Sequence, residues 1–168
     1  SASAPTWDKF LNDVFEGDQQ RINFVEEWLG YLMVTDYSFQ KIAMFIGVQR
    51  SGKTTIQNIG EALIGRDNFM SIGLEGFANE GTLEGGLTKT ALWVGDAGTI
   101  QGPNRGKIVD NLKTISGNGG ISCSRKFKSP FSGRIPGRIS ITCNNILQFN
   151  DDSGALAGRF LICPFNRS

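Results

Sequence analysis

The sequence predicts an α/β fold in which a mostly parallel central sheet is flanked by helices and preceded by a small helical segment. Short apolar runs, typical of strands buried on both faces, alternate along the chain with segments of helical periodicity. The chain has 168 residues, 39% of them hydrophobic, which suits one domain with a packed core. We place a helical segment at 1–38 and the main domain at 39–168.

The helical segment is expected to contain two helices. Apolar residues recur on one face of 6–15, and Thr6 stands where an N-cap would lie. A second helix is expected over 21–29, ending at Gly30, because glycine commonly terminates helices.

The main domain is expected to alternate strands with helices. Its four predicted strands are 42–46, 91–94, 139–143 and 160–163. Its predicted helices are 53–64, ended by Gly65, and 104–116. The residues that helical spacing turns toward the core are Ile56, Ile59 and Leu63 in the first helix and Ile108, Leu112 and Ile115 in the second. Residues 121–134 form a predicted β-hairpin with a basic tip.

Composition excludes several classes of function. The formal net charge is +1, so any contact with nucleic acid must come from a local basic cluster. The chain has no His, which excludes His-based catalytic triads and His-containing zinc sites. Cys123, Cys143 and Cys163 form no CxxC motif, so we expect reduced thiols in an intracellular protein. No apolar run approaches the ~18 residues of a membrane span, so no membrane partner is expected.

Residues 47–54 read GVQRSGKT and match the phosphate-binding pattern G-x-x-x-x-G-K-[ST]. Glycines let backbone N–H groups turn toward phosphates, Lys53 reaches the β- and γ-phosphates, and Thr54 offers a hydroxyl to Mg²⁺. The loop lies between a predicted buried strand and a predicted helix, as the motif requires. A glycine-rich turn without a ligand is the alternative. The residues assigned to nucleotide binding are Gly47, Val48, Gln49, Arg50, Ser51, Gly52, Lys53, Thr54 and Thr55.

Three later polar residues are candidates for the chemistry of nucleotide hydrolysis. That reaction needs an acid for Mg²⁺ and the attacking water, a polar group near the γ-phosphate, and a cation for the transition state. Asp96 follows the strand at 91–94, Asn144 ends the strand at 139–143, and Arg159 precedes the last strand. The plainer alternatives are turn residues for Asp96 and Asn144 and a solvated side chain for Arg159.

The order of these motifs resembles the superfamily 3 helicases, and more closely the helicase domain of phage, plasmid and large-DNA-virus primase–helicases. The phosphate loop is followed by an acid-bearing strand, a basic hairpin, a strand ending in Thr-Cys-Asn and the stretch Ala-Leu-x-x-Arg-Phe. The stretches LKTISG (112–117), RKFKSP (125–130) and DDSGALAGRFLICPF (151–165) carry the resemblance, which covers about residues 28–168.

This resemblance implies an AAA+-type P-loop ATPase that works as a hexameric ring on DNA, with ATP and Mg²⁺ as cofactors. It implies contacts of Lys53 and Thr54 with ATP and Mg²⁺, a Walker B role for Asp96 on Mg²⁺, and a sensor role for Asn144. Arg159 would be a finger that reaches the neighbouring subunit's site. The expected protein is a DNA helicase domain of a viral, phage or plasmid replication protein in the host cytoplasm, with any primase domain in the same full-length protein.

The resemblance also implies that Lys126 and Lys128 of the hairpin point into the channel of the ring, and Arg125 stands beside them. Strand alternation places the two lysines on the same side. A nearly neutral chain can bind single-stranded DNA when six copies place a few cations on one strand. The plainer alternative is that these lysines keep an edge hairpin soluble.

One departure from the family concerns the residues around Asp96. Many relatives carry two adjacent acids or a Glu there, whereas Gly95 and Ala97 flank Asp96 in this chain. A nucleotide-dependent oligomerisation and DNA-loading module with little turnover is therefore the alternative function. A small-molecule kinase is a further alternative, but the scattered arginines argue against the Arg-rich lid that it would need.

Overall fold

A computed structural model describes residues 4–34, 36, 38–100, 102–125, 128–149 and 154–166, except for the side chains of 123–125, 128, 129 and 131. The helices are α1 (Pro5–Phe15), α2 (Gln19–Leu32), α3 (Lys53–Ile64), α4 (Glu80–Gly85) and α5 (Arg105–Ser116). The short 3₁₀ helices are η1 (Arg66–Asn68), η2 (Leu74–Ala78), η3 (Gly86–Thr88) and η4 (Ala157–Arg159).

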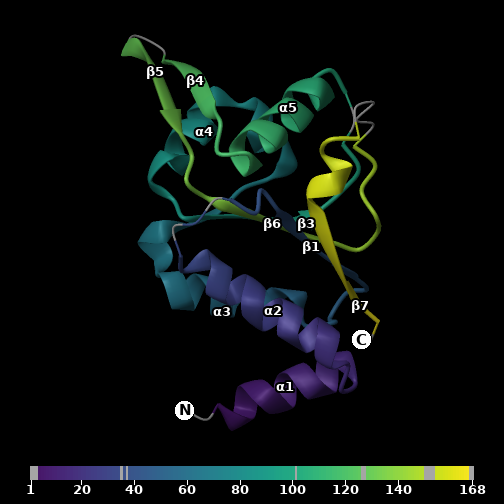
Figure 1. Cartoon of the computed structure of the whole chain (residues 1–168). Coiled ribbons are helices and arrows are strands. Elements are labelled where there is room, and N and C mark those ends of the chain that lie inside the picture. The colour runs from purple at the N-terminus through teal and green to yellow at the C-terminus, as the bar shows by residue number, and fades with distance from the viewer. Residues whose placement is uncertain are drawn as a thin grey trace.

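The centre of the molecule is a parallel sheet with the strand order β2-β3-β6-β1-β7. Its strands are β1 (Ile42–Gly47), β2 (Phe69–Ser71), β3 (Ala91–Ala97), β6 (Arg138–Cys143) and β7 (Phe160–Phe165). A separate antiparallel hairpin consists of β4 (Gly120–Arg125) and β5 (Lys128–Arg134). Helices α1–α3 cover one face of the sheet, and α4, α5 and the hairpin lie on the other (Figure 1). This arrangement confirms the predicted α/β fold with a helical segment before the sheet.

The central strands read as continuous apolar runs because both of their faces are covered. All six residues of β6 are buried, although Arg138, Ser140 and Thr142 are polar. Along β1, alternate side chains enter opposite layers: Ile42 and Met44 join one core, while Ala43 and Phe45 join the other.

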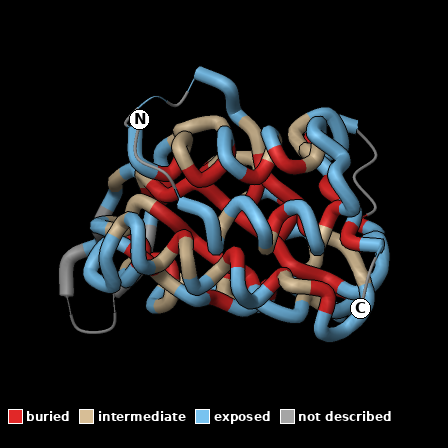
Figure 2. Tube along the Cα trace, turned by 90° about the horizontal axis from the view of Figure 1, so that it is seen from below, coloured by how far each residue is buried: buried red, intermediate tan, exposed pale blue. Residues whose placement is uncertain are grey.

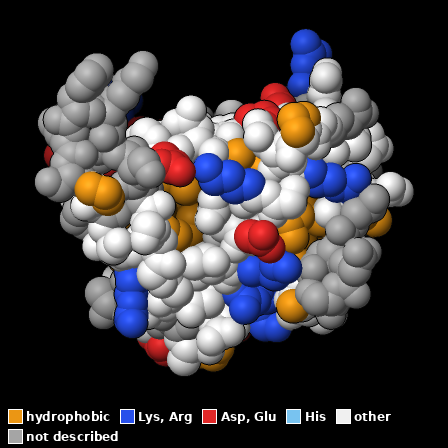
Figure 3. Space-filling view, turned by 90° about the horizontal axis from the view of Figure 1, so that it is seen from above, with side chains coloured by type: hydrophobic (Ala, Val, Ile, Leu, Met, Phe, Trp, Pro, Cys, Tyr) orange, Lys and Arg blue, Asp and Glu red, His pale blue; other side chains and the backbone are white. Residues whose placement is uncertain are grey.

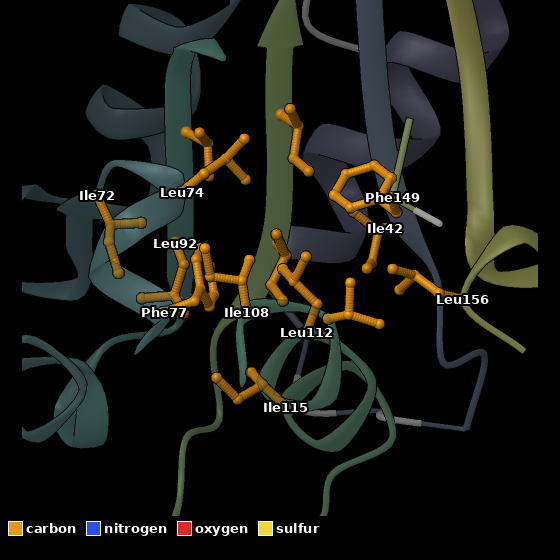
Figure 4. Packing of buried hydrophobic residues seen from close by; sticks show 14 of the residues in the cluster. Ile42, Ile72, Leu74, Phe77, Leu92, Ile108, Leu112, Ile115, Phe149 and Leu156 are labelled. Carbon is orange, nitrogen blue, oxygen red and sulfur yellow. The ribbon is translucent and has the colours of Figure 1, made fainter. Parts of the chain in front are cut away.

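The two cores hold the three layers together. One packs the sheet against α5 and the segments around α4, and Figure 4 shows Ile108, Leu112 and Ile115 of α5 among its members, as the helical spacing predicts. The other packs Leu11, Trp28 and further residues of α1 and α2 against β1, β3 and β7. Seen from the α1–α3 side, the helices turn exposed surfaces outward and buried ones toward the sheet (Figure 2). The domain boundary between residues 38 and 39 stays a prediction.

The ends of α1 and α2 differ from expectation. Thr6 is inside α1 and not its N-cap, because Pro5 begins the helix and its fixed φ suits the first helical position. The second helix continues through Gly30 to Leu32, so the prediction that Gly30 ends it is wrong. Burial of Leu32 against the sheet outweighs the cost of about 1 kcal/mol that an internal glycine brings. At the other end, the Asp18 carboxylate accepts two backbone N–H bonds as N-cap.

Helix α3 has the predicted bounds, and Gly65 follows it with a φ of 83°. Ile56 is buried and Ile59 packs against the same core, as predicted, together with Gly60 and Ile64. Leu63 is 49% exposed, contrary to prediction. The row through Ile56, Gly60 and Ile64 faces the core, and a Cβ on Gly60 would lie 3.3 Å from the Trp93 ring, so the glycine lets α3 pack closely there.

Several short elements carry no clear pattern in the sequence. β2 has three residues and α4 has six, and the 3₁₀ helices lie between longer elements. Cys143 and Cys163 are free thiols, as expected, and both are fully buried; the side chain of Cys123 lies outside the described part. Among the described residues, no helix is long and apolar enough to span a membrane.

Candidate functional site

The carboxyl ends of three neighbouring strands bring the predicted site residues together. Because β3, β6 and β1 are adjacent and parallel, the residues that follow them meet at one edge of the sheet. A pocket of about 750 Å³ lies there. Its lining residues are Phe10, Asp13, Val14, Gln49, Arg50, Ser51, Gly52, Lys53, Thr54, Thr55, Asp96 and Asn144.

The loop between β1 and α3 depends on glycine at two places. A Cβ on Gly47 would lie 2.2 Å from the carbonyl oxygen of Phe165 in β7, so no larger residue fits there. Gly52 has a φ of 99°, and a Cβ there would come within 3.2 Å of Phe10 and Val14 of α1. The loop is therefore wedged between the neighbouring strand and α1, and it leads directly into the N-terminus of α3.

Lys53 begins α3 and points back into its own loop. Its side chain is 6% exposed, and its ammonium donates to the carbonyl oxygens of Gly47 (2.5 Å) and Val48 (2.7 Å) and to Ser51 Oγ (3.1 Å). All three acceptors belong to the loop that the sequence motif assigns to phosphate. The first turn of α3 adds unpaired backbone N–H groups and the positive end of the helix dipole to the same place.

Asp96 lies opposite the loop at the end of β3. Its backbone is left-handed, with a φ of 45°, and the register between β3 and β6 shifts between Val94 and Ala97. The Asp96 N–H donates to Thr142 Oγ1 (3.2 Å), and that hydroxyl donates to the Val94 carbonyl (3.2 Å). A β-bulge and the Thr142 hydroxyl thus fix the backbone that carries the carboxylate.

The electrostatics of the pocket tie Lys53 to Asp96 and Cys143. Burial lowers the pKa of Lys53, and the charge of Asp96 acts in the opposite direction. Burial also raises the pKa of Cys143 to about 11, which keeps this thiol neutral near pH 7. The Lys53 ammonium is therefore balanced mainly by Asp96 and by loop carbonyls.

Asn144 lines the pocket as an exposed residue directly after β6, as its place at the end of that strand predicts. The sequence motif contains neither Phe10 nor Asp13 nor Val14, yet all three line the pocket from α1. Nothing in the loop pattern could have revealed them. The one signal in the sequence is the amphipathic face of α1, which predicts packing but not its location.

Arg159 does not line this pocket. Its guanidinium donates to the Lys113 carbonyl and to Ser116 Oγ (2.8 Å), and it covers Gly117 at the C-terminal end of α5. A cation at this position satisfies the free carbonyls of the last helical turn. Within this chain, Arg159 thus links η4 to α5, and its role as a finger stays a prediction.

The basic hairpin lies on the face of the sheet that carries α5, away from α1 (Figure 1). Arg125 ends β4 and pairs in register with Lys128, which begins β5. Their side chains, and all of Lys126, lie outside the described part of the chain. The hairpin itself is confirmed, and DNA binding by its tip stays a prediction.

The residues present fit a polyphosphate with a divalent cation. The loop and the start of α3 supply backbone N–H groups, the Lys53 ammonium and the hydroxyls of Thr54 and Thr55. The facing strand supplies the Asp96 carboxylate. The described residues contain no group of three or more His, Cys, Asp or Glu that could hold a metal alone. A cation here would thus take most of its ligands from phosphate oxygens and water, as Mg²⁺ does in such sites.

Comparison with known proteins adds a family to this geometry. Residues 45–159 match DUF5906, which is described as a family of unknown function. The chain belongs to this family. The match runs from inside β1 to Arg159, so it includes the phosphate loop, Asp96 and Asn144.

Two solved structures share the fold. The C-terminal region of NrS-1 is 16% identical with a TM-score of 0.69, over 99% of this chain and 39% of its own length. JCV helicase is 17% identical with a TM-score of 0.62, over 96% of this chain and 44% of its own length. The chain thus spans about two fifths of each of these proteins. At these identities the likeness concerns the fold, which is similar to that of helicase domains.

Proposed function

We propose that this chain is an ATP-hydrolysing DNA helicase domain of superfamily 3 type, from a viral, phage or plasmid replication protein. The observation that carries the proposal is that the phosphate loop, Asp96 and Asn144 line one and the same pocket. The fold likeness to JCV helicase supports the same class. We place the domain in an AAA+-type ring, in the host cytoplasm, within a longer protein that also holds any primase domain.

Nucleotide binding falls to the loop and the start of α3. Backbone N–H groups of 47–52 and the helix N-terminus would cradle the phosphates, and Lys53 would exchange loop carbonyls for phosphate oxygens. Thr54 and Asp96 would hold Mg²⁺, which neutralises phosphate charge and polarises the phosphoryl group when bound. Asn144 would hydrogen-bond the γ-phosphate or orient the attacking water.

Arg159 would complete the site of a neighbouring subunit. This requires its guanidinium to exchange the α5 carbonyl for the phosphates of an adjacent copy, which links ring assembly to hydrolysis. Because Arg159 does not line the pocket of its own chain, its action would be in trans.

DNA would be contacted by the hairpin residues Arg125, Lys126 and Lys128. On the face with α4, α5 and the hairpin, the described Lys and Arg side chains form several groups with uncharged surface between them (Figure 3). Six copies would place two lysines each along one strand. The logarithm of the affinity for single-stranded DNA should then fall with the logarithm of the salt concentration, with a slope of about −0.7 per neutralised phosphate. The double variant Lys126→Ala/Lys128→Ala should flatten this slope and keep ATP affinity, which fluorescence anisotropy at two salt concentrations measures.

The proposal is tested by ATPase activity with and without single-stranded DNA, together with native mass spectrometry in a non-hydrolysable ATP analogue. We expect turnover that DNA stimulates and a six-membered assembly. A monomer that neither binds nor hydrolyses ATP would refute the proposal.

A second function is a nucleotide-dependent oligomerisation and DNA-loading module with little turnover. It is favoured by the residues beside Asp96, because Gly95 and Ala97 supply no second acid. Apart from Asp96, the described pocket lining offers only the Asp13 carboxylate. ATP binding and ring assembly without DNA-stimulated turnover would favour this function over the first.

A further inference from the structure

Arg50 lines the pocket with Lys53 and Asp96. In the proposed function it contributes only its backbone N–H, and its side chain has no assigned role. It is exposed, and within the described part of the chain its guanidinium makes no hydrogen bond or ion pair. By contrast, the guanidinium groups of Arg138 and Arg159 donate to backbone carbonyls. Arg50 therefore contributes a free cation beside a site that suits an anion.

The backbone at Arg50 makes its side chain costly to keep. Its φ is 62°, in the left-handed region that glycine adopts freely and a residue with a Cβ does not. The described non-glycine residues with positive φ are Glu16, Gln40, Arg50, Asp96 and Asn118. Two of these five, Arg50 and Asp96, line this one pocket. Such outliers commonly mark functional positions, and a glycine at 50 would suit the loop backbone better.

We propose that Arg50 is a second phosphate-binding cation, which approaches the nucleotide from the solvent side while Lys53 approaches from the buried side. The planar guanidinium can donate two parallel bonds to phosphate oxygens, which an ammonium cannot. The inference rests on the proposed nucleotide site and gives the side chain of one of its loop residues a role.

Because of this backbone conformation, one substitution should raise the thermal stability and lower the affinity for MgATP. Arg50→Gly removes the left-handed strain and should raise Tm by about 2–4 °C. The same substitution removes the phosphate contact and should weaken MgATP binding about tenfold. A merely solvated arginine would show the first effect without the second.

Two control variants separate strain and net charge from phosphate contact. Gln40→Gly relieves a φ of 50° at an exposed neutral residue before β1, so it should raise Tm and leave MgATP affinity unchanged. Arg66→Gln removes one cation whose side chain is 92% exposed, just beyond the far end of the 12-residue α3. It should leave affinity within about twofold, since surface charges at this distance are screened.

A second pair of variants tests the charge at position 50 while the backbone strain there stays the same. Arg50→Lys and Arg50→Gln both keep a side chain on the left-handed backbone, so their Tm values should stay close to that of the wild type. Arg50→Gln should lose about as much MgATP affinity as Arg50→Gly, and Arg50→Lys should lose less.

The experiment is isothermal titration of the whole chain with MgATP, MgADP and adenosine, together with thermal melting of each variant. Support requires weaker binding of the nucleotides in Arg50→Gly and Arg50→Gln and unchanged affinity in both controls. Equal MgATP affinity of Arg50→Gln and wild type would overturn the inference while leaving the nucleotide site standing. If folded wild type binds neither nucleotide, the proposed function itself fails, and the role of Arg50 fails with it.

Discussion

The pocket at the carboxyl edge of the sheet and the junction of η4 with α5 each hold a buried or half-buried cation, but they hold it differently. Lys53 is bonded to carbonyl oxygens of its own loop, all within six residues. Arg159 is bonded across 43 and 46 residues to the end of another element. Lys53 can therefore exchange partners by a local change, whereas Arg159 can leave only by uncoupling η4 from α5. The first arrangement suits a side chain that gives up its partners to a ligand, and the second links two elements of the fold.

The largest expected effect comes from removing Arg159. As a finger acting in trans, its loss in Arg159→Ala should lower ATP turnover by about 10³–10⁵, the range known for GTPase fingers. It should also lower the free energy of unfolding by about 1.5–3 kcal/mol, because the bonds to the end of α5 are lost. Steady-state ATPase assays and chemical denaturation measure the two effects.

Ser116→Ala is the matched control for Arg159, because it removes one acceptor and keeps the guanidinium. It should cost about 1 kcal/mol of stability and retain turnover. Mixed rings of Arg159→Ala and Lys53→Ala subunits should recover activity, since intact sites form at some interfaces. Inactive mixed rings under conditions of subunit exchange would leave Arg159 as a structural link to α5 alone.

A smaller effect is expected from Lys53→Ala, which should weaken MgATP binding about ten- to a hundredfold through loss of a charge-assisted contact. Lys89→Ala serves as the control, because Lys89 also donates to a backbone carbonyl, that of Asp67, far along the chain from the loop. Calorimetric titration should show wild-type affinity for the control. Equal affinities for Lys53→Ala and wild type would contradict the assignment of Lys53 to phosphate, and its bonds to the loop carbonyls would then serve only the fold.

The thiols give a pH-dependent measure of the sheet around the pocket. Burial raises the pKa of Cys163 from 9.0 to about 12, so the folded state holds its proton more tightly than the unfolded state. This contribution to stability is complete below pH 9 and decreases as pH rises toward 12. Between pH 9 and 11 the loss should be on the order of 2 kcal/mol.

Cys163→Ala should flatten this alkaline decline in urea unfolding at pH 8, 9, 10 and 11. Lys53 has the opposite effect. Burial lowers its pKa, so the unfolded state binds the proton more tightly and the free energy of unfolding rises with pH. A variant whose slope equals that of wild type would show that Cys163 is less buried than the sheet packing places it.

The sequence predicted those parts of the molecule whose cause is local. The strand at 42–46, the loop at 47–54 and the helix at 53–64 follow from an apolar run, glycine positions and periodicity, and all three lie where expected. The meeting of Asp96 with Asn144 was also predictable, since carboxyl ends of parallel strands share an edge. By contrast, the inward turn of Gly60 and the approach of Phe10 to Gly52 depend on contacts between distant segments. No local pattern encodes them, and the same is true of the bond from Arg159 to α5.

The smallest expected effect concerns the support beneath Asp96. Thr142→Val keeps the shape of the side chain but removes the hydroxyl that accepts the Asp96 N–H and donates to Val94. The unfolding free energy should fall by about 1 kcal/mol, and ATP turnover should fall a few-fold, because the left-handed backbone at Asp96 loses its partner. MgATP affinity should change little, since Lys53 and its loop stay intact. Thr90→Val is the matched control, because this threonine donates to the Asn68 carbonyl just before the opposite end of β3. If both variants lose similar stability and only Thr142→Val loses turnover, Thr142 positions the carboxylate. If neither loses turnover, the carboxylate is held by the β-bulge alone, and the polar bond from β6 contributes only to folding.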